Sequence, residues 1–322
     1  MNSAPDFDWN ELAFGNKKTI NNLKAVFIAA PRELSAARFT QLIKTYLPQG
    51  NIVLGLAKEA YVQGLEKQPQ FKMLSLETVQ NSIASVNAAG LKHRIYTLAY
   101  FQRDLRYLLE KLDFQKAVFV NGSWYHSFHL RSEYYILANR QVPYELVSPF
   151  ASEGEARRYA AERPGSVAVP AVKGLLSAAD MLKLANQVAK NSFDYSFQIG
   201  VALGLRQGKA YRLLAAAHNP VVPFETFAMH HGASREIHFS PAQDLNYYDT
   251  IHAEVALLIK VQKEKLELHD TTLFINLLPC PTCARMLAQT DIAELVYSLD
   301  HSDGYAAKML VAAGKKVRRI VP

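Results

Sequence analysis

Four residues of this chain could together form a metal site with an acid–base group. The sequence contains only two cysteines, Cys280 and Cys283, in the segment PCPTC. His252 and Glu254 precede them in the segment IHAEV. Thiolate sulfur and imidazole nitrogen are ligands that zinc prefers in proteins. One histidine and two cysteines provide three ligands, which leaves the fourth position of a tetrahedral zinc ion for water, as in catalytic sites.

Glu254 would give such a site an acid–base group. A carboxylate beside the water of a zinc site can take a proton from that water and pass it to a leaving group. Zinc lowers the pKa of this water to roughly 7, so that hydroxide is available near neutral pH. Attack on an electron-poor ring carbon that carries an amino group would then release ammonia. The four residues therefore predict hydrolytic deamination with one Zn²⁺ per chain.

Two predicted helices place these side chains. Pro281 directly follows Cys280, and proline is favoured in the first turn of a helix. Cys280 is therefore expected at the entrance of a helix over PTCARMLAQT, where the positive end of the helix dipole favours a thiolate. His252 begins a second predicted helix, HAEVALLIKVQKEK. Residues two apart do not share a face inside a helix, so His252 and Glu254 meet only because they lie at its start.

The surrounding elements predict a mixed α/β domain. Ser177 is an N-cap with Asp180 three residues later, which predicts a helix there. The segment FQIGVALGLRQGKAYRLLAAAHN follows as a hairpin, with Gly208 near its turn. Three further strands are expected over TTLFINLL, AELVYSL and KVRRIVP, each preceded by a helix. Five strands interleaved with helices predict a three-layer α/β/α domain over residues 176–322.

The pattern H-x-E…P-C-x-x-C resembles the zinc-dependent cytidine/deoxycytidylate deaminase superfamily. The resemblance covers about residues 177–322, and the order of the expected elements is similar to that fold. It implies that the imidazole and the two thiolates bind zinc and that the glutamate shuttles protons. It also implies a substrate site at Asn219, which matches the position that contacts the sugar, and at Ala253 and Pro279.

The resemblance favours a cytosine nucleotide, dCMP or CMP, as the substrate. A histidine as first ligand is typical of deoxycytidylate, tRNA-adenosine, guanine and polynucleotide cytidine deaminases. The long segment between Asn219 and His252 resembles the insertion of deoxycytidylate deaminases. The chain departs from those enzymes where Pro220 replaces their glycine after the asparagine. His230, His231 and His238 lie in the insertion, but no cysteine accompanies them to hold a second zinc, so surface histidines are the favoured interpretation.

Two other functions remain open. The first is a deaminase that acts on RNA or single-stranded DNA, or on another purine or pyrimidine base. The second is a non-catalytic zinc-containing module that binds nucleotides. A small-molecule nucleotide is the preferred partner, nucleic acid is the less favoured one, and the family resemblance implies a homo-oligomer.

The first half of the chain alternates between apolar runs and segments of helical period. The expected strands are KAVFIAA, NIVLGLA, HRIYTLA, KAVFVNG and PYELVSPF. Apolar strands that alternate with helices predict a parallel sheet covered on both faces, here a Rossmann-like α/β domain over residues 21–150. Ligands of such sheets bind beyond the carboxyl ends of the strands. No phosphate-binding loop of the G-x-x-x-x-G-K-[ST] or G-x-G-x-x-G type is present.

The loop NGSWYHSFHLR is the candidate ligand site of this half. Asn121, Trp124, His129 and Arg131 could stack on a base and hold a phosphate, which predicts a second nucleotide there. The alternative is a loop whose aromatic residues pack beneath the sheet edge.

The length and composition of the chain limit the possible number of domains and the possible compartment. The chain has 322 residues, a length that accommodates two domains. We expect an N-terminal tail over residues 1–20 and a linker with a short helix over residues 151–175. The net charge of +7 lies mostly in residues 1–175, but the basic residues are scattered. The first residues lack the order of a signal peptide, no run of residues is long enough for a membrane span, and the CxxC spacing suggests a reducing compartment. These features predict a cytoplasmic protein.

Overall fold

The computed structural model describes residues 6–8, 24–162, 174–242, 244, 246–301 and 303–321. It divides the chain into two compact units. Unit 1 contains Met1–Arg163 and Thr226–Tyr248, and unit 2 contains Pro164–Glu225 and Asp249–Pro322. The sequence predicted one continuous domain from residue 176 onward. In the structure, the segment Thr226–Tyr248, the excursion, leaves unit 2 and joins unit 1.

Unit 1 is built on a six-stranded sheet in which every paired strand is parallel. The strands are β1 (Asp6–Asp8), β2 (Ala25–Ile28), β3 (Asn51–Ala57), β4 (Ile95–Tyr100), β5 (Lys116–Val120) and β6 (Tyr144–Val147). The last five are the strands that the apolar runs predicted. The short strand β1 falls within the predicted tail, where its backbone pairs with β4. Two aspartates in a three-residue strand give no β-forming signal, so the sequence pattern could not indicate it.

The spatial order of these strands is β1-β4-β3-β2-β5-β6. The chain therefore proceeds outward from β2 through β3 to β4, and then returns to the other side of β2 as β5. The place between β2 and β5 is where the strand order reverses. Ligands of open parallel sheets bind outside the carboxyl ends of the strands at such a point.

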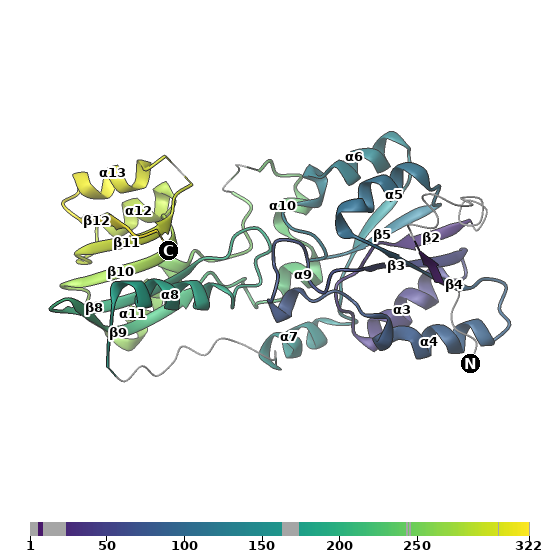
Figure 1. Ribbon diagram of the computed structural model, residues 1–322, viewed down its shortest axis with the longest axis horizontal. Coiled ribbons are helices and arrows are strands. Elements are labelled where there is room, and N and C mark those ends of the chain that lie inside the picture. Colours follow the sequence, from purple (N-terminus) through teal and green to yellow (C-terminus); the bar gives the residue numbers. More distant parts are fainter. Residues whose placement is uncertain are drawn as a thin grey trace. The chain divides into compact units, whose positions relative to one another are not determined.

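Helices cover both faces of this sheet, as the apolar strands predicted. In Figure 1, α3 (Ala36–Tyr46) and α4 (Leu76–Ala88) lie on one face, and α5 (Leu105–Lys111) and α6 (Ser132–Asn139) lie on the other. Helix α3 begins at Ser35, whose side chain accepts a hydrogen bond from the backbone of Arg38 at 3.0 Å. Its apolar side packs with α4 and with alternate residues of β2, β3, β4 and β5 in one core.

Six further helical elements of unit 1 lie within the described residues. They are η1 (Pro69–Phe71), η2 (Gln102–Asp104), η3 (Phe128–Leu130), α7 (Glu153–Glu162), α9 (Phe227–His231) and α10 (Ser234–Ile237). Helix α7 lies where the sequence predicted a short helix. The last two helices belong to the excursion. Side chains fasten it to the rest of unit 1: Thr226 donates to the Ala156 carbonyl at 2.7 Å, and Asn121 donates to the Met229 carbonyl at 3.1 Å.

Unit 2 is a three-layer α/β/α sandwich, as predicted. Its sheet has the order β12-β11-β10-β8-β9-β7. The strands are β7 (Leu175–Leu176), β8 (Gly200–Gln207), β9 (Ala210–His218), β10 (Thr271–Leu277), β11 (Glu294–Leu299) and β12 (Lys316–Arg319). Strands β8 and β9 form the predicted hairpin, and β10, β11 and β12 run parallel to one another.

One helix covers one face of this second sheet and three helices cover the other. Helix α8 (Ala178–Ala189) begins at Ser177 and packs on one face. The opposite face carries α11 (Ala253–Glu264), α12 (Pro281–Ala288) and α13 (Tyr305–Ala312). Gly200 lets α8 approach closely, because a Cβ atom there would lie 2.0 Å from the Ala185 carbonyl oxygen.

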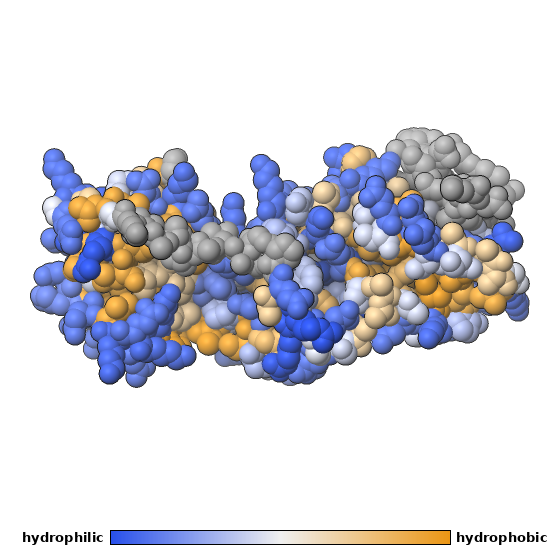
Figure 2. Space-filling view, turned by 90° about the horizontal axis from the view of Figure 1, so that it is seen from below, coloured by the Kyte–Doolittle hydropathy of each residue, from blue (hydrophilic) through white to orange (hydrophobic). Residues whose placement is uncertain are grey.

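The surface gives little further indication of partners. Within the described ranges, no helix combines the length and the hydrophobicity that crossing a lipid bilayer would require. On the face drawn in Figure 2, apolar residues are interspersed among hydrophilic ones on both units.

Candidate metal centre

The predicted metal ligands lie at the starts of α11 and α12. His252 is the N-cap of α11, and Cys280 is the N-cap of α12 with Pro281 in the first turn. The Cys280 sulfur accepts a hydrogen bond from the backbone of Cys283 at 3.4 Å. This N–H belongs to the unsatisfied first turn of the helix, which favours negative charge on the sulfur.

The three ligand atoms are close enough to hold one zinc ion. They lie within 4.8 Å of one another. His252 Nδ1 is 3.2 Å from Cys283 Sγ and 3.5 Å from Cys280 Sγ. Tetrahedral zinc with Zn–N of about 2.0 Å and Zn–S of about 2.3 Å separates nitrogen from sulfur by about 3.5 Å. The donor atoms therefore fit one Zn²⁺, with His252 binding through Nδ1.

Hydrogen bonds join His252 Nδ1 to both cysteine sulfurs, so these groups share protons. The hydrogen bond from the Cys283 thiol lowers the pKa of Cys280, and the hydrogen bond to Cys280 raises the pKa of His252. A metal ion would replace those shared protons, because zinc binds thiolates and neutral imidazole.

Glu254 lies in the first turn of α11, and only 3% of the residue is exposed. Burial raises the pKa of its carboxyl group to about 7. A bound cation would lower this pKa again. A carboxyl group in this range can both accept and donate a proton near neutral pH.

Asn219 follows β9 and is buried, with its amide engaged by the loop before β8. Its Oδ1 accepts from the backbone of Ile199 at 2.9 Å, and its Nδ2 donates to the Phe197 carbonyl at 2.8 Å. Its predicted contact with the substrate sugar stays a prediction. Ala253 and Pro279 are both buried, and each directly adjoins a metal-ligand residue in the chain.

Asp194 also lies near this site, although it belongs to none of the predicted motifs. Its carboxylate accepts from the backbone of Ser196 at 2.7 Å and from the Thr250 hydroxyl at 3.3 Å. Its negative charge contributes to the raised pKa of His252. The segment FDYSF is typical of an Asx turn before a strand, and this signal could have indicated that the aspartate organises the loop.

Comparison with known proteins finds a family model that is similar to the part of the chain that contains this site. Residues 177–299 match the family model described as the cytidine and deoxycytidylate deaminase zinc-binding region. This span contains all three ligand residues and Glu254.

Residues 177–299 are therefore similar to cytidine and deoxycytidylate deaminase zinc-binding regions.

The individual proteins to which this part of the chain is similar are distant. A probable deoxycytidylate deaminase of Drosophila melanogaster is 32% identical over 92 residues, which are 26% of this chain and 42% of that relative. The dCMP deaminase of cyanophage S-TIM5 is 19% identical over 44% of this chain and 96% of its own, with a TM-score of 0.33. A guanine deaminase from Nitrosomonas europaea is 16% identical over 48% of this chain and 84% of its own, with a TM-score of 0.33.

The histidines of the excursion are engaged separately. His230 Nδ1 lies 2.7 Å from the Ser148 hydroxyl, His231 Nε2 lies 3.2 Å from Glu153, and His238 stacks on Tyr247 with ring centroids 4.4 Å apart. Among the residues that the structure describes, His252, Cys280 and Cys283 are the only set of three or more histidine, cysteine or acidic side chains placed to hold a metal.

The candidate ligand loop of unit 1 divides into two pairs. Trp124 and Arg131 line a pocket. Asn121 and His129 instead bond the excursion: His129 Nδ1 lies 3.0 Å from Glu236, and its Nε2 lies 2.9 Å from the Ser240 carbonyl. The excursion is distant in the sequence, so the pattern of the loop gave no sign of this second pairing.

Proposed function

We propose that unit 2 catalyses the zinc-dependent hydrolytic deamination of a cytosine nucleotide, dCMP or CMP, to the uracil nucleotide with release of ammonia. The observation that carries this proposal is the convergence of one imidazole, two thiol sulfurs and a buried carboxyl group at two helix starts. The matched family model and the deoxycytidylate deaminase named among the relatives support a cytosine nucleotide.

Each residue has one task in this proposal. His252, Cys280 and Cys283 hold the zinc ion, which when bound supplies the Lewis acid that makes water nucleophilic near neutral pH. Glu254 takes a proton at its carboxylate and delivers it to the amino group that leaves as ammonia. Because this side chain is buried, bulk water does not reach it. Its proton is therefore transferred to the substrate and not to solvent.

The bonds formed and broken balance in this reaction. Water adds its oxygen to the ring carbon that bears the amino group, and the carbon–nitrogen bond then breaks. One proton of water reaches the departing nitrogen by way of Glu254, the other ends on the adjacent ring nitrogen, and the ring is left with a carbonyl group. No oxidant or reductant is required.

The test is an ammonia-release assay of the Glu254→Gln variant, with elemental analysis for zinc. Glutamine keeps the size of the side chain but cannot carry the proton. We expect ammonia release from dCMP to fall by about 10²–10⁴-fold, while the zinc content stays at the wild-type level. Glu264→Gln, at the other end of α11, is the matched control and should retain activity.

The substrate assignment is tested by the same assay on other compounds. dCMP, CMP, cytidine, guanine, adenine, RNA and single-stranded DNA are compared with the wild-type protein. If ammonia were released faster from an oligonucleotide or from another base than from dCMP and CMP, that compound would be the substrate in place of the cytosine nucleotide. Full activity in Glu254→Gln would remove this residue from its role. A zinc-loaded protein that releases ammonia from none of these compounds would contradict deamination altogether.

A further inference from the structure

Unit 1 contains a pocket at the point where the order of its strands reverses. Its lining includes Ala29 and Ala30, which directly follow β2, and Ser123 and Trp124 in the loop after β5. Tyr100, the last residue of β4, completes it from a third strand. The pocket therefore lies beyond the carboxyl ends of the central strands, where open parallel sheets bind their ligands.

Two side chains of this pocket carry polar atoms that the described residues leave without a hydrogen-bond partner. These atoms are the Tyr100 hydroxyl and the indole Nε1 of Trp124. Tyr100 is fully buried, and Trp124 is 7% exposed. Buried polar groups are nearly always hydrogen-bonded, so each unpaired one requires an explanation. An indole N–H can only donate, so its missing partner is an acceptor atom.

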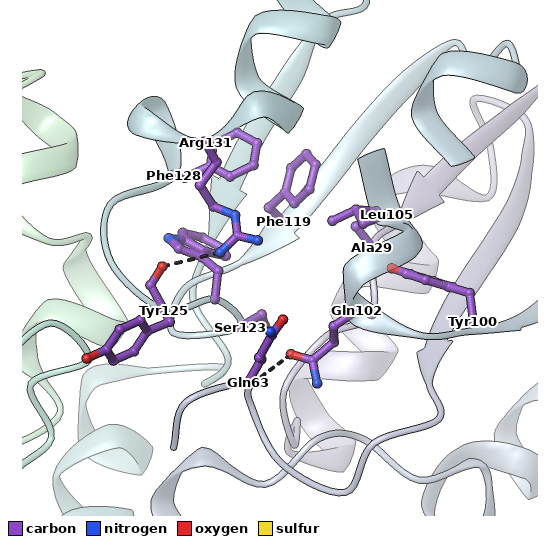
Figure 3. A pocket seen from close by; sticks show the side chains of 12 residues that line it. Ala29, Gln63, Tyr100, Gln102, Leu105, Phe119, Ser123, Tyr125, Phe128 and Arg131 are labelled. Atoms are coloured by element: carbon purple, nitrogen blue, oxygen red, sulfur yellow. Dashed lines mark hydrogen bonds between the residues drawn. The ribbon is translucent and has the colours of Figure 1, made fainter. Parts of the chain in front are cut away.

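The one cationic side chain in the lining of this pocket is paired with a carboxylate. Arg131, which also lines it, forms an ion pair with Glu133 at 3.2 Å, and the Glu133 side chain is 5% exposed. Figure 3 shows the Arg131 guanidinium and the Tyr100 hydroxyl on opposite sides of the Phe119 ring in that view. Because Glu133 neutralises the arginine, an anionic ligand would gain little net attraction there, and an uncharged acceptor is favoured.

Part of the remaining wall is aromatic, beside Gln63, Gln102 and Leu105. The Phe119 ring lies 4.4 Å from that of Phe128 and 6.3 Å from that of Trp124, measured between centroids. The enclosed space measures about 30 Å³, which is room for two or three water-sized atoms. It is too small for a whole nucleotide but large enough for the polar edge of a flat ring.

We propose that this pocket binds the acceptor-bearing edge of a small, uncharged heteroaromatic ring of the nucleobase class. Two acceptor atoms of the ring receive hydrogen bonds from the Tyr100 hydroxyl and from Trp124 Nε1. The aromatic walls contact the ring itself. This site is separate from the zinc site, because all of its lining residues belong to unit 1.

Trp124 provides a local test of this proposal. The chain has two tryptophans, so Trp9→Phe leaves Trp124 as the only indole. We expect uracil, which has two carbonyl acceptors, to change the fluorescence of this variant in a saturable manner. Benzene lacks acceptors, and acetate and inorganic phosphate are anions; none of the three should match uracil. Unit 2 has no tryptophan, so binding of uracil to the zinc site does not give this signal.

Tyr100→Phe, in the same background, removes one of the two donors. We expect the dissociation constant for uracil to rise about 3- to 10-fold, the loss of one hydrogen bond between uncharged groups. The melting temperature should stay or increase, because the variant also removes a buried unpaired hydroxyl. Tyr107→Phe, which makes the same change at an exposed tyrosine of α5, should bind uracil like the parent.

Three results would overturn the proposal. They are the absence of a saturable response to uracil, equal affinity in the Tyr100→Phe protein, and a saturable response to acetate or phosphate without one to uracil. Each is independent of ammonia release, so failure here leaves the proposed deamination untouched.

Discussion

His129 and Glu236 form a buried pair 107 residues apart in the sequence, with 3.0 Å between Nδ1 and Oε2. Their side chains are 7% and 5% exposed. The same carboxylate accepts hydrogen bonds from the backbone N–H groups of Phe128 and His129. One glutamate of the excursion therefore holds both the backbone and the side chain of the candidate ligand loop in unit 1.

Removing this carboxylate should destabilise unit 1. Glu236→Ala leaves an imidazole and two backbone N–H groups buried without their acceptor, and breaking a buried pair in this way typically costs about 3–5 kcal/mol. Denaturant unfolding in the Trp9→Phe background, followed by Trp124 fluorescence, measures the loss. Glu110→Ala, which breaks the exposed pair with Arg106, should cost no more than about 0.5 kcal/mol. Equal effects of the two variants would contradict the importance of the buried pair.

The cysteines can be tested by their metal content. Cys280→Ser or Cys283→Ser removes one of three ligands, and we expect the purified protein to lose most of its zinc. Thr282→Ser, a change between the two cysteines, should keep it. Elemental analysis of protein that has not been treated with chelators makes the measurement. If both cysteine variants kept their full zinc content, the metal would be bound at a site other than these cysteines.

The close contact between β8 and α8 gives a steric prediction. In Gly200→Ala, the new Cβ atom would lie 2.0 Å from the Ala185 carbonyl oxygen and 2.6 Å from the Ala189 nitrogen. Both are backbone atoms and cannot turn aside, so we expect the free energy of unfolding of unit 2 to fall by about 3 kcal/mol. Gly154→Ala is the control, since its nearest neighbour would lie at 3.8 Å. Similar stabilities of the two variants would contradict this packing.

The environment of His230 leads us to expect that the free energy of unfolding depends on pH. Burial lowers its pKa, with a further contribution from the nearby His231 and Arg38 that outweighs Glu153 and Glu155. Ser148 Oγ already accepts from the backbone of Phe150 at 3.0 Å, so its hydroxyl proton can be donated to the neutral Nδ1 of His230. The folded state therefore resists protonation of this ring.

The sign of the effect follows from this resistance. Below the ordinary histidine pKa of about 6.5, the unfolded chain gains a proton that the folded chain binds less readily. The free energy of unfolding should therefore decrease as the pH falls through this value. His230→Asn keeps an acceptor near Nδ1 without titrating, and should flatten the curve, whereas the exposed His269→Asn should not. Parallel curves for wild type and His230→Asn would show that this histidine is not responsible.

The sequence predicted most of the fold because its signals are local. Apolar runs indicated the strands β2 to β6 in unit 1, and Ser177 and Pro281 indicated where α8 and α12 begin. The metal ligands were recognisable because two cysteines and a histidine at helix starts are rare in combination. Each of these inferences depends on residues that are neighbours in the chain.

The rest depends on contacts that local patterns do not record. Asn121 and His129 belong to a loop with the composition of a ligand site, yet their side chains bond residues about 110 positions away. Nothing near His129 in the sequence distinguishes it from Trp124, which does line the pocket. Tertiary packing determines that the excursion joins unit 1. The sequence therefore predicted one continuous domain from residue 176 and did not indicate that this segment leaves it.

The route of the backbone has a practical consequence for anyone who dissects this molecule. The polypeptide passes between its two units near residues 163, 225 and 248, so a single scission cannot yield two intact halves. A fragment beginning near residue 174 would carry Thr226–Tyr248 without the side chains that receive it. Expression of the zinc-binding part alone therefore calls for replacing that segment with a short connection between Glu225 and Asp249, rather than for simple truncation.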